Sequence, residues 1–161
     1  MALPTTTNPC SVVIDANVAI AICAKEADKL TEAESKMKEY ATNGCAFFAP
    51  GAIVMECLFV FCRKLMTGVI TPAEHTSAVQ AFITLMRVVN PPPSGDKSLI
   101  KRAEEIRGNL GCSHSADGIY LALAEELAKV SDTEVVTFDN GMQSQAPKGV
   151  PGLLVVVLPT V

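Results

Sequence analysis

Two aspartates, Asp15 and Asp139, each follow directly on a short apolar run that is typical of a buried strand. The runs are residues 12–14 and 135–138. In an open parallel sheet, the ligand site lies outside the carboxyl ends of the strands. Both carboxylates are therefore expected at one edge of a sheet, although a role as an ordinary turn or cap residue is open for each.

Two further acids stand out by their surroundings. Asp117 falls in the first turn of an expected helix, where the positive end of the helix dipole favours a carboxylate. Glu56 is the only charged residue between Pro50 and Arg63. An ionised carboxylate in such surroundings is costly unless it is paired, hydrogen-bonded or bound to a metal. A helix-start role for Asp117 and a surface or hydrogen-bonded position for Glu56 remain open.

Together, Asp15, Glu56, Asp117 and Asp139 indicate a site for a hard divalent cation. No set of His or Cys ligands lies near them in the sequence, and carboxylate oxygens favour Mg²⁺ or Mn²⁺. Water bound to such an ion becomes a nucleophile, and the ion stabilises the charge that develops on a phosphate during in-line displacement. The predicted chemistry is metal-dependent hydrolysis of a phosphodiester, without a serine, cysteine or histidine nucleophile.

The elements that must position these acids alternate along the chain. The expected strands are residues 11–14, 45–49, 87–89, 134–137 and 153–158, and the expected helices are residues 16–30, 31–40, 52–66, 72–85, 96–109 and 115–129. Such alternation implies βαβ units and a parallel sheet covered on both faces. The predicted fold class is α/β, a three-layer α/β/α sandwich with a central, mainly parallel twisted sheet.

Local signals refine several of these helices. Thr71 with Glu74, and Thr31 with Glu34, have the spacing of capping boxes, and Ser94 or Asp96 can cap the helix that follows them. The apolar density of residues 52–66 predicts a deeply packed helix. The helix at residues 73–85 is interpreted as core, with a dimer surface as the alternative.

Length and composition indicate one domain, residues 1–161, whose first ten residues form a flexible extension. Hydrophobic residues make up 49% and charged residues 19% of the chain, which argues against disorder. No apolar stretch is long enough to span a bilayer, and the N-terminus lacks the features of a signal peptide. A cytoplasmic protein without a membrane partner is expected.

The cysteines and the charge restrict the classes of site further. Six cysteines, at positions 10, 23, 45, 57, 62 and 112, lie mostly in apolar runs and form no CxxC pair. They are expected to be small buried residues in a reducing compartment rather than zinc ligands. The net charge is −4 and the basic residues are scattered, so any contact with RNA must be local.

Several segments, in order, resemble the motifs of PIN domains. They are Val13-Ile14-Asp15-Ala16-Asn17, Met55-Glu56, the run from Ser115 to Glu125, Val136-Thr137-Phe138-Asp139, and a closing Gly152 to Val156 with Pro159. The match covers nearly the whole chain, and the Asp117 motif with its spacing to Asp139 is its most specific part. Among PIN domains, the chain resembles the VapC-like ribonuclease toxins of type II toxin–antitoxin systems.

This resemblance implies an endoribonuclease in which the four acids carry Mg²⁺ or Mn²⁺. It implies that Asn17 and Thr137 are polar neighbours of the ligands, although a helix-start role for Asn17 and a strand role for Thr137 are equally open. His114 and Asn140 are lesser candidates for contact with the substrate. The implied partners are RNA, a second copy of the chain and a small antitoxin whose tail covers the acidic groove. The chain is longer and richer in cysteine than the typical pattern.

Two other functions remain open from the sequence. A non-catalytic PIN-like module that binds RNA or protein would suit the acidic net charge. A phosphotransferase could use Asp15 as its nucleophile. Such enzymes usually have a second aspartate two residues later, where this chain has Asn17.

Overall fold

The computed structural model describes residues 10–112 and 117–161, and the strands within them form one parallel sheet. The strands are β1 (Cys10–Ile14), β2 (Ala46–Phe48), β3 (Val89–Asn90), β4 (Asp132–Thr137) and β5 (Leu154–Val157). Their order, β3-β2-β1-β4-β5, puts β1 at the centre. The chain moves outward from β1 to β3 and then returns to the other side for β4 and β5. The order therefore reverses between β1 and β4.

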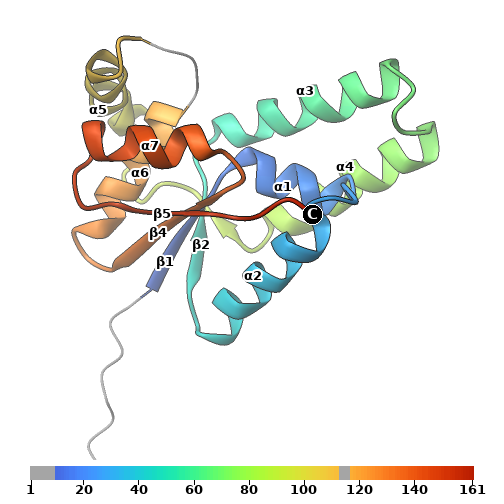
Figure 1. The fold of residues 1–161 in the computed structure, drawn as a ribbon, viewed down its shortest axis with the longest axis horizontal. Helices are drawn as coiled ribbons and strands as arrows, with labels where there is room; N and C mark the ends of the chain where they lie inside the picture. Colours follow the sequence, from blue (N-terminus) through green and yellow to red (C-terminus); the bar gives the residue numbers. More distant parts are fainter. Residues whose placement is uncertain (1–9, 113–116) are drawn as a thin grey trace, which may run out of the picture.

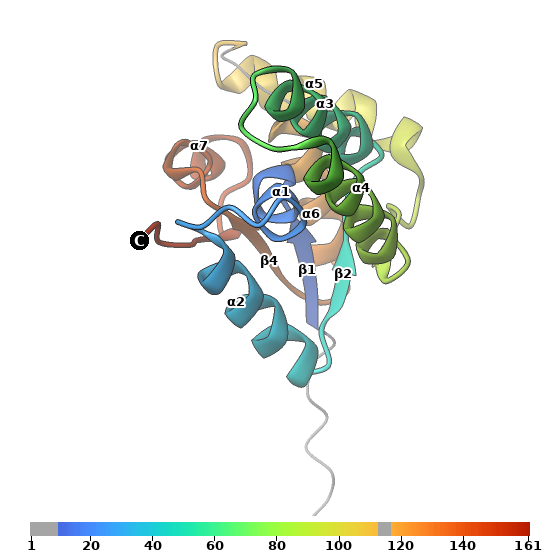
Figure 2. The same cartoon turned by 90° about the vertical axis from the view of Figure 1, so that its right-hand side faces the viewer.

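Helices cover both faces of this sheet, as Figures 1 and 2 show. They are α1 (Ala16–Cys23), α2 (Leu30–Thr42), α3 (Ala52–Met66), α4 (Pro72–Met86), α5 (Asp96–Asn109), α6 (Asp117–Ala128) and α7 (Asn140–Gly149). Helix α1 packs with α2, α3 and α4, whereas α6 lies against β1 and β4 and packs with α5 and α7. The predicted three-layer α/β/α sandwich is confirmed.

The central strands are apolar on both sides because both sides are covered. Val13 and Ile14 in β1 and Val135 and Val136 in β4 are completely buried. These strands pair in parallel, with Val13 opposite Val135 and Ile14 opposite Val136. A parallel sheet between two helical layers requires such continuous apolar runs, which is why the strand prediction succeeded here.

The first predicted helix was too long. Helix α1 ends at Cys23, and Lys25 adopts a φ of 53°, a left-handed conformation that side-chain-bearing residues rarely adopt. The chain reverses there and α2 begins at Leu30 after Lys29, with no side-chain cap, so the prediction that Thr31 caps this helix is wrong. Backbone bonds around Glu26 hold the reversal, and these were not visible in the sequence.

Of two predicted helix starts, one is confirmed and one differs from expectation. The Thr71 and Glu74 capping box forms as predicted. Gly95 rather than Ser94 or Asp96 precedes α5, because the Asp96 carboxylate instead accepts a hydrogen bond of 2.8 Å from the Gly51 backbone N–H. That bond ties the start of α5 to the start of α3.

Helix α7 was not predicted at all. Gly141 and Pro147 lie within it, and both residue types have low helix propensity. The Asp139 side chain accepts a hydrogen bond from the Gly141 N–H, which satisfies one of the free donors at the helix start. The cap by the Asp139 side chain therefore offsets the low helix propensity of Gly141 and Pro147.

Helix α3 has the predicted bounds but not the predicted environment. Only Ile53, Cys57 and Phe61 are buried, and they form one face of the helix. Met55 and Phe59 on another face are 71% and 65% exposed. The prediction of a deeply packed helix is therefore wrong, because apolar density along a helix does not reveal whether a second element covers its outer face.

The cysteine prediction holds only in part. Cys23 and Cys57 are buried, but Cys62 and Cys112 are exposed, and Cys10 forms a disulfide with Cys45. The strand register explains this bond, because the residues after Cys10 and Cys45 pair across β1 and β2. Cys10 thus begins β1 instead of ending the expected N-terminal extension, of which residues 1–9 lie outside the described part. No helix in residues 10–112 and 117–161 is long and apolar enough to cross a membrane.

The disulfide predicts a redox-dependent stability. It closes a segment with a sequence separation of 35 residues, which in the chain-entropy account corresponds to about 3 to 4 kcal/mol of unfolding free energy. Cys45→Ser, or reduction with dithiothreitol, should lower the unfolding free energy by about that amount. Urea titrations would measure it, with Cys62→Ser as the control for an exposed free thiol. Equal midpoints for the oxidised and reduced protein would contradict this expectation.

Candidate active site

The predicted acids Asp15 and Asp139 lie at the point where the strand order reverses. Asp15 directly follows β1, and its backbone N–H donates a hydrogen bond of 3.1 Å to the Val136 carbonyl of β4. Thr137 ends β4, and Asp139 follows two residues later. In open α/β sheets, the crevice at such a reversal is the usual ligand site. The topology therefore supports the placement expected from the sequence.

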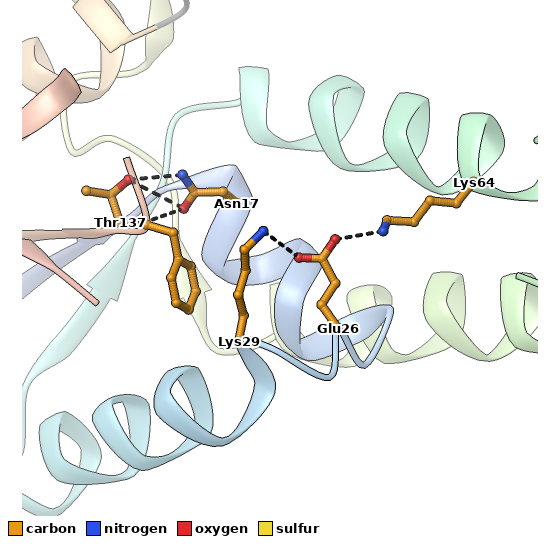
Figure 3. A network of polar contacts seen from close by, with 6 residues as sticks. Asn17, Glu26, Lys29, Lys64 and Thr137 are labelled. Atoms are coloured by element: carbon orange, nitrogen blue, oxygen red, sulfur yellow. Dashed lines mark hydrogen bonds and ion pairs between the residues drawn. The ribbon is translucent and has the colours of Figure 1, made fainter. Parts of the chain in front are cut away.

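The Thr137 hydroxyl connects these residues. It donates a hydrogen bond of 2.6 Å to the Asp15 carboxylate. It also accepts hydrogen bonds from the Asn17 amide at 3.0 Å and from the Asp139 N–H at 2.9 Å. The Asn17 carbonyl oxygen accepts from the Phe138 N–H at 3.1 Å, and Figure 3 shows the pair of Asn17 and Thr137 from close by. Thr137 therefore contacts Asp15 directly, and Asn17 is linked to Asp15 through Thr137.

The Asp15 carboxyl group is in an unfavourable place for a negative charge. The residue is 6% exposed, and burial raises the pKa of Asp15 to about 6 in spite of the opposing hydrogen bond from Thr137. The negative charges of Asp117 and Asp139 raise this pKa further. Asp15 therefore interacts electrostatically with two of the other predicted acids.

Glu56 joins the same cluster from α3. Burial, followed by the negative charges of Asp15 and Asp117, raises the pKa of Glu56 to about 7. A hydrogen bond of 3.4 Å from the Tyr120 hydroxyl to the Glu56 carboxylate acts in the opposite direction. The four acids predicted from the sequence therefore come from four different segments and act on one another electrostatically.

Tyr120 is a residue that the sequence analysis missed. Its side chain is completely buried, and its hydroxyl reaches Glu56 across the gap between α6 and α3. It stands three residues after Asp117, a spacing that puts both side chains on one face of a helix. A tyrosine in the otherwise aliphatic run of α6 was the available signal, because a buried hydroxyl requires a partner.

The remaining candidates are less informative. Asp139 is exposed and caps α7, so the simple cap role considered for it does occur, alongside its electrostatic effect on Asp15. Asn140 is exposed at the first position of α7. Position 114 is outside the described residues, so the prediction for His114 stays a prediction.

The four carboxylates are suitable ligands for a divalent metal, but they are not arranged as a complete metal site. In residues 10–112 and 117–161, no three His, Cys, Asp or Glu side chains form a group that could hold a metal ion as they stand. The negative charges of Asp117 and Asp139 nevertheless raise the pKa of Asp15, and those of Asp15 and Asp117 raise the pKa of Glu56. A divalent cation would relieve that repulsion, and all-oxygen donors suit Mg²⁺ or Mn²⁺.

The raised pKa of Asp15 predicts how stability depends on pH in the absence of metal. The folded protein keeps the Asp15 proton up to about pH 6, whereas the unfolded chain loses it near pH 4. Between these values, the unfolding free energy should fall as the pH rises. Asp15→Asn should reduce this fall, to which Glu56 with its raised pKa also contributes, and, at high pH in EDTA, should stabilise the protein by on the order of 2 kcal/mol.

Urea titrations at several pH values would test this expectation. Asp28→Asn, which changes an exposed aspartate, is the matched control. A variant that loses stability relative to the wild type as the pH rises would contradict it.

No protein-family profile matches this sequence, and no curated protein matches it. The structure is similar to a chain in the crystal structure of VapBC2 from Rickettsia felis bound to a DNA fragment from their promoter, with a TM-score of 0.64. The two share 10% sequence identity, and the similarity covers 92% of this chain and 98% of that chain. At this identity the similarity establishes the fold: the chain has the α/β architecture of a protein in the VapBC2 complex.

Proposed function

We propose that this protein is a PIN-like, divalent-metal-dependent endoribonuclease. The observation that supports this most is the gathering of Asp15, Glu56, Asp117 and Asp139 at the reversal of strand order, where their charges repel one another. Buried like charges destabilise a fold, and proteins keep such clusters where function uses them. A cation that these acids bind in common is the simplest such use.

In this proposal the four carboxylates hold Mg²⁺ or Mn²⁺, and each remaining residue has a defined part. The bound ion would supply an acidified water and charge stabilisation at the phosphate. Thr137 orients the Asp15 carboxylate through its 2.6 Å hydrogen bond. Asn17 holds the Thr137 hydroxyl and the Phe138 backbone in place. Tyr120 limits the motion of Glu56.

Cleavage assays on RNA would test the proposal. Wild-type protein should cut structured or unstructured RNA with Mn²⁺ or Mg²⁺ and be inactive in EDTA. Asp15→Asn and Asp117→Asn should each reduce cleavage by roughly a hundredfold or more, since a metal site contributes several kcal/mol of charge stabilisation. Glu34→Gln, an exposed acid on α2, is the control. Undiminished cleavage by both aspartate variants would rule the proposal out.

A non-catalytic module is the second candidate. Two observations favour it: the net charge is −4, and the described acids do not already form a ligand group. Such a module would bind RNA or protein and give no cleavage product with any metal. The same assays therefore decide between the two functions. An assay of phosphate release from small phosphoesters would test the phosphotransferase alternative.

We further propose that the protein is the toxin of a toxin–antitoxin pair and forms a homodimer. The similarity to a chain of the VapBC2 complex supports an antitoxin partner. The homodimer is supported by an exposed apolar surface, the α3 stripe, consisting of Met55, Leu58, Phe59, Cys62 and Met66. The stripe carries no charge, so it can pack against its own copy around a two-fold axis without leaving a charge unpaired. In Figure 1, α3 and α4 extend beyond the sheet.

The dimer has a direct test. Phe59→Asp places a charge at the centre of the α3 stripe and should convert a dimer into a monomer in light-scattering measurements of mass. Ile100→Asp is the matched control, because Ile100 is 62% exposed on α5 and Phe59 is 65% exposed. A wild-type protein that is monomeric at micromolar concentration would disprove the homodimer.

A further inference from the structure

The reversal between α1 and α2 fixes one residue, Glu26, unusually well. Its backbone N–H donates to the Ala21 carbonyl at 3.0 Å, and its own carbonyl accepts from the N–H groups of Lys29 and Leu30. The preceding residue, Lys25, has a φ of 53°. Such a conformation costs free energy and persists only where the surroundings determine it. The chain therefore maintains a strained turn that places the Glu26 side chain.

The Glu26 carboxylate joins two elements that are distant in sequence. It forms an ion pair of 2.7 Å with the Lys64 ammonium group of α3 and accepts a hydrogen bond of 3.1 Å from the Lys29 ammonium group before α2. The Glu26 side chain is only 15% exposed, and the two lysine side chains are 22% and 27% exposed. Burial opposes ionisation of Glu26, but both lysines outweigh it and leave its pKa below the ordinary value.

This ion-pair cluster lies close to Asn17 and Thr137 of the candidate active site, as Figure 3 shows. The Lys29 ammonium lies 5.7 Å from the centre of the Phe138 ring, within the range of a cation–π interaction. The Phe138 N–H is bound to Asn17, and Thr137 beside it is bound to Asp15. One end of the cluster thus reaches the segment that ends in Asp139.

The other end of the cluster reaches Glu56 along α3. Lys64 stands eight residues after Glu56, which corresponds to roughly 12 Å along the helix axis. Between them, the Cys57 thiol contacts the Ala16 carbonyl of α1 at 3.8 Å. The first three turns of α3 are anchored by the buried side chains of Ile53, Cys57 and Phe61, and the Phe61 ring packs edge-to-face with Phe82 of α4. The Glu26–Lys64 ion pair holds the last turn of α3, beyond these contacts.

We propose that Glu26 is a positioning residue of the active site: by binding Lys64 and Lys29 together, it sets the position of Glu56 on α3 relative to Asp15 and Asp139. This inference rests on the proposed metal-dependent function. In this inference, the cluster of Glu26, Lys29 and Lys64 helps to hold carboxylates from separate segments where they can bind one ion. In the part of the chain that the structure describes, the acids do not form a ligand group as they stand, so they have to move closer together to bind one ion.

Affinity for Mn²⁺, measured by calorimetry without RNA, tests this directly. Glu26→Gln and Lys64→Met should each weaken Mn²⁺ binding by about tenfold, the size of effect found for residues that orient metal ligands. The double variant should be no weaker than Glu26→Gln alone, because Glu26→Gln already removes the Glu26–Lys64 pair together with the Glu26–Lys29 pair. Lys64→Arg should keep the affinity. Lys36→Met, which breaks the Lys36–Glu39 pair on α2, is the control and should leave it unchanged.

A loss of stability alone cannot produce this pattern. Urea titrations at the assay temperature would establish that each variant is folded, and a folded Glu26→Gln protein with wild-type Mn²⁺ affinity overturns the inference. Additive losses in the double variant overturn it too, since they would assign separate roles to Glu26 and Lys64. Wild-type protein that binds no Mn²⁺ overturns the proposed function itself, and the inference with it.

Discussion

The hydrogen bond from the Thr137 hydroxyl to the Asp15 carboxylate joins the two central strands at the place where the sheet reverses its order. Much of the site depends on it. The same hydroxyl accepts hydrogen bonds from the Asn17 amide and from the Asp139 N–H. One completely buried oxygen thus fixes the positions of three residues of the candidate site. A buried hydroxyl with this many partners leaves little freedom to its neighbours. The surrounding apolar strands, in turn, keep water from competing for the bond.

The residues of the candidate site differ in how firmly they are held. Asp15 and Thr137 are held by the sheet, whereas Glu56 arrives on α3, whose outer face is exposed, and reaches Tyr120 only through a long hydrogen bond of 3.4 Å. Buried carboxyl groups that repel one another need an external charge to remain ionised together. A site in which Asp15 is held in place and Glu56 is held less firmly suits a positively charged ligand that draws the carboxylates together.

The sequence predicted the parts of this structure that depend on local pattern. The apolar runs of β1 and β4 and the aspartates after them were identified, because a buried parallel strand is apolar on both faces and its end is marked by the first polar residue. It failed where the outcome depends on a contact that the apolar pattern does not encode, whether that contact is distant in the sequence or local. The disulfide of Cys10 depends on the β1–β2 register, the end of α1 depends on bonds around Glu26, and α7 depends on a cap from Asp139. Tyr120 was overlooked because its polar partner, Glu56, is 64 residues away.

The pairing of β1 with β4 also determines when the site can form during synthesis. Asp15 and Thr137 are 122 residues apart in the sequence, so one edge of β1 stays unpaired while the segment between them is made. At about 5 to 20 residues per second, this interval is roughly 6 to 24 seconds. Contacts of such long sequence separation are also the slowest to form in folding. A nascent or truncated chain that lacks β4 therefore cannot form the hydrogen bond between Thr137 and Asp15, and Asp15 lacks both Thr137 and Asp139 until that segment has been made.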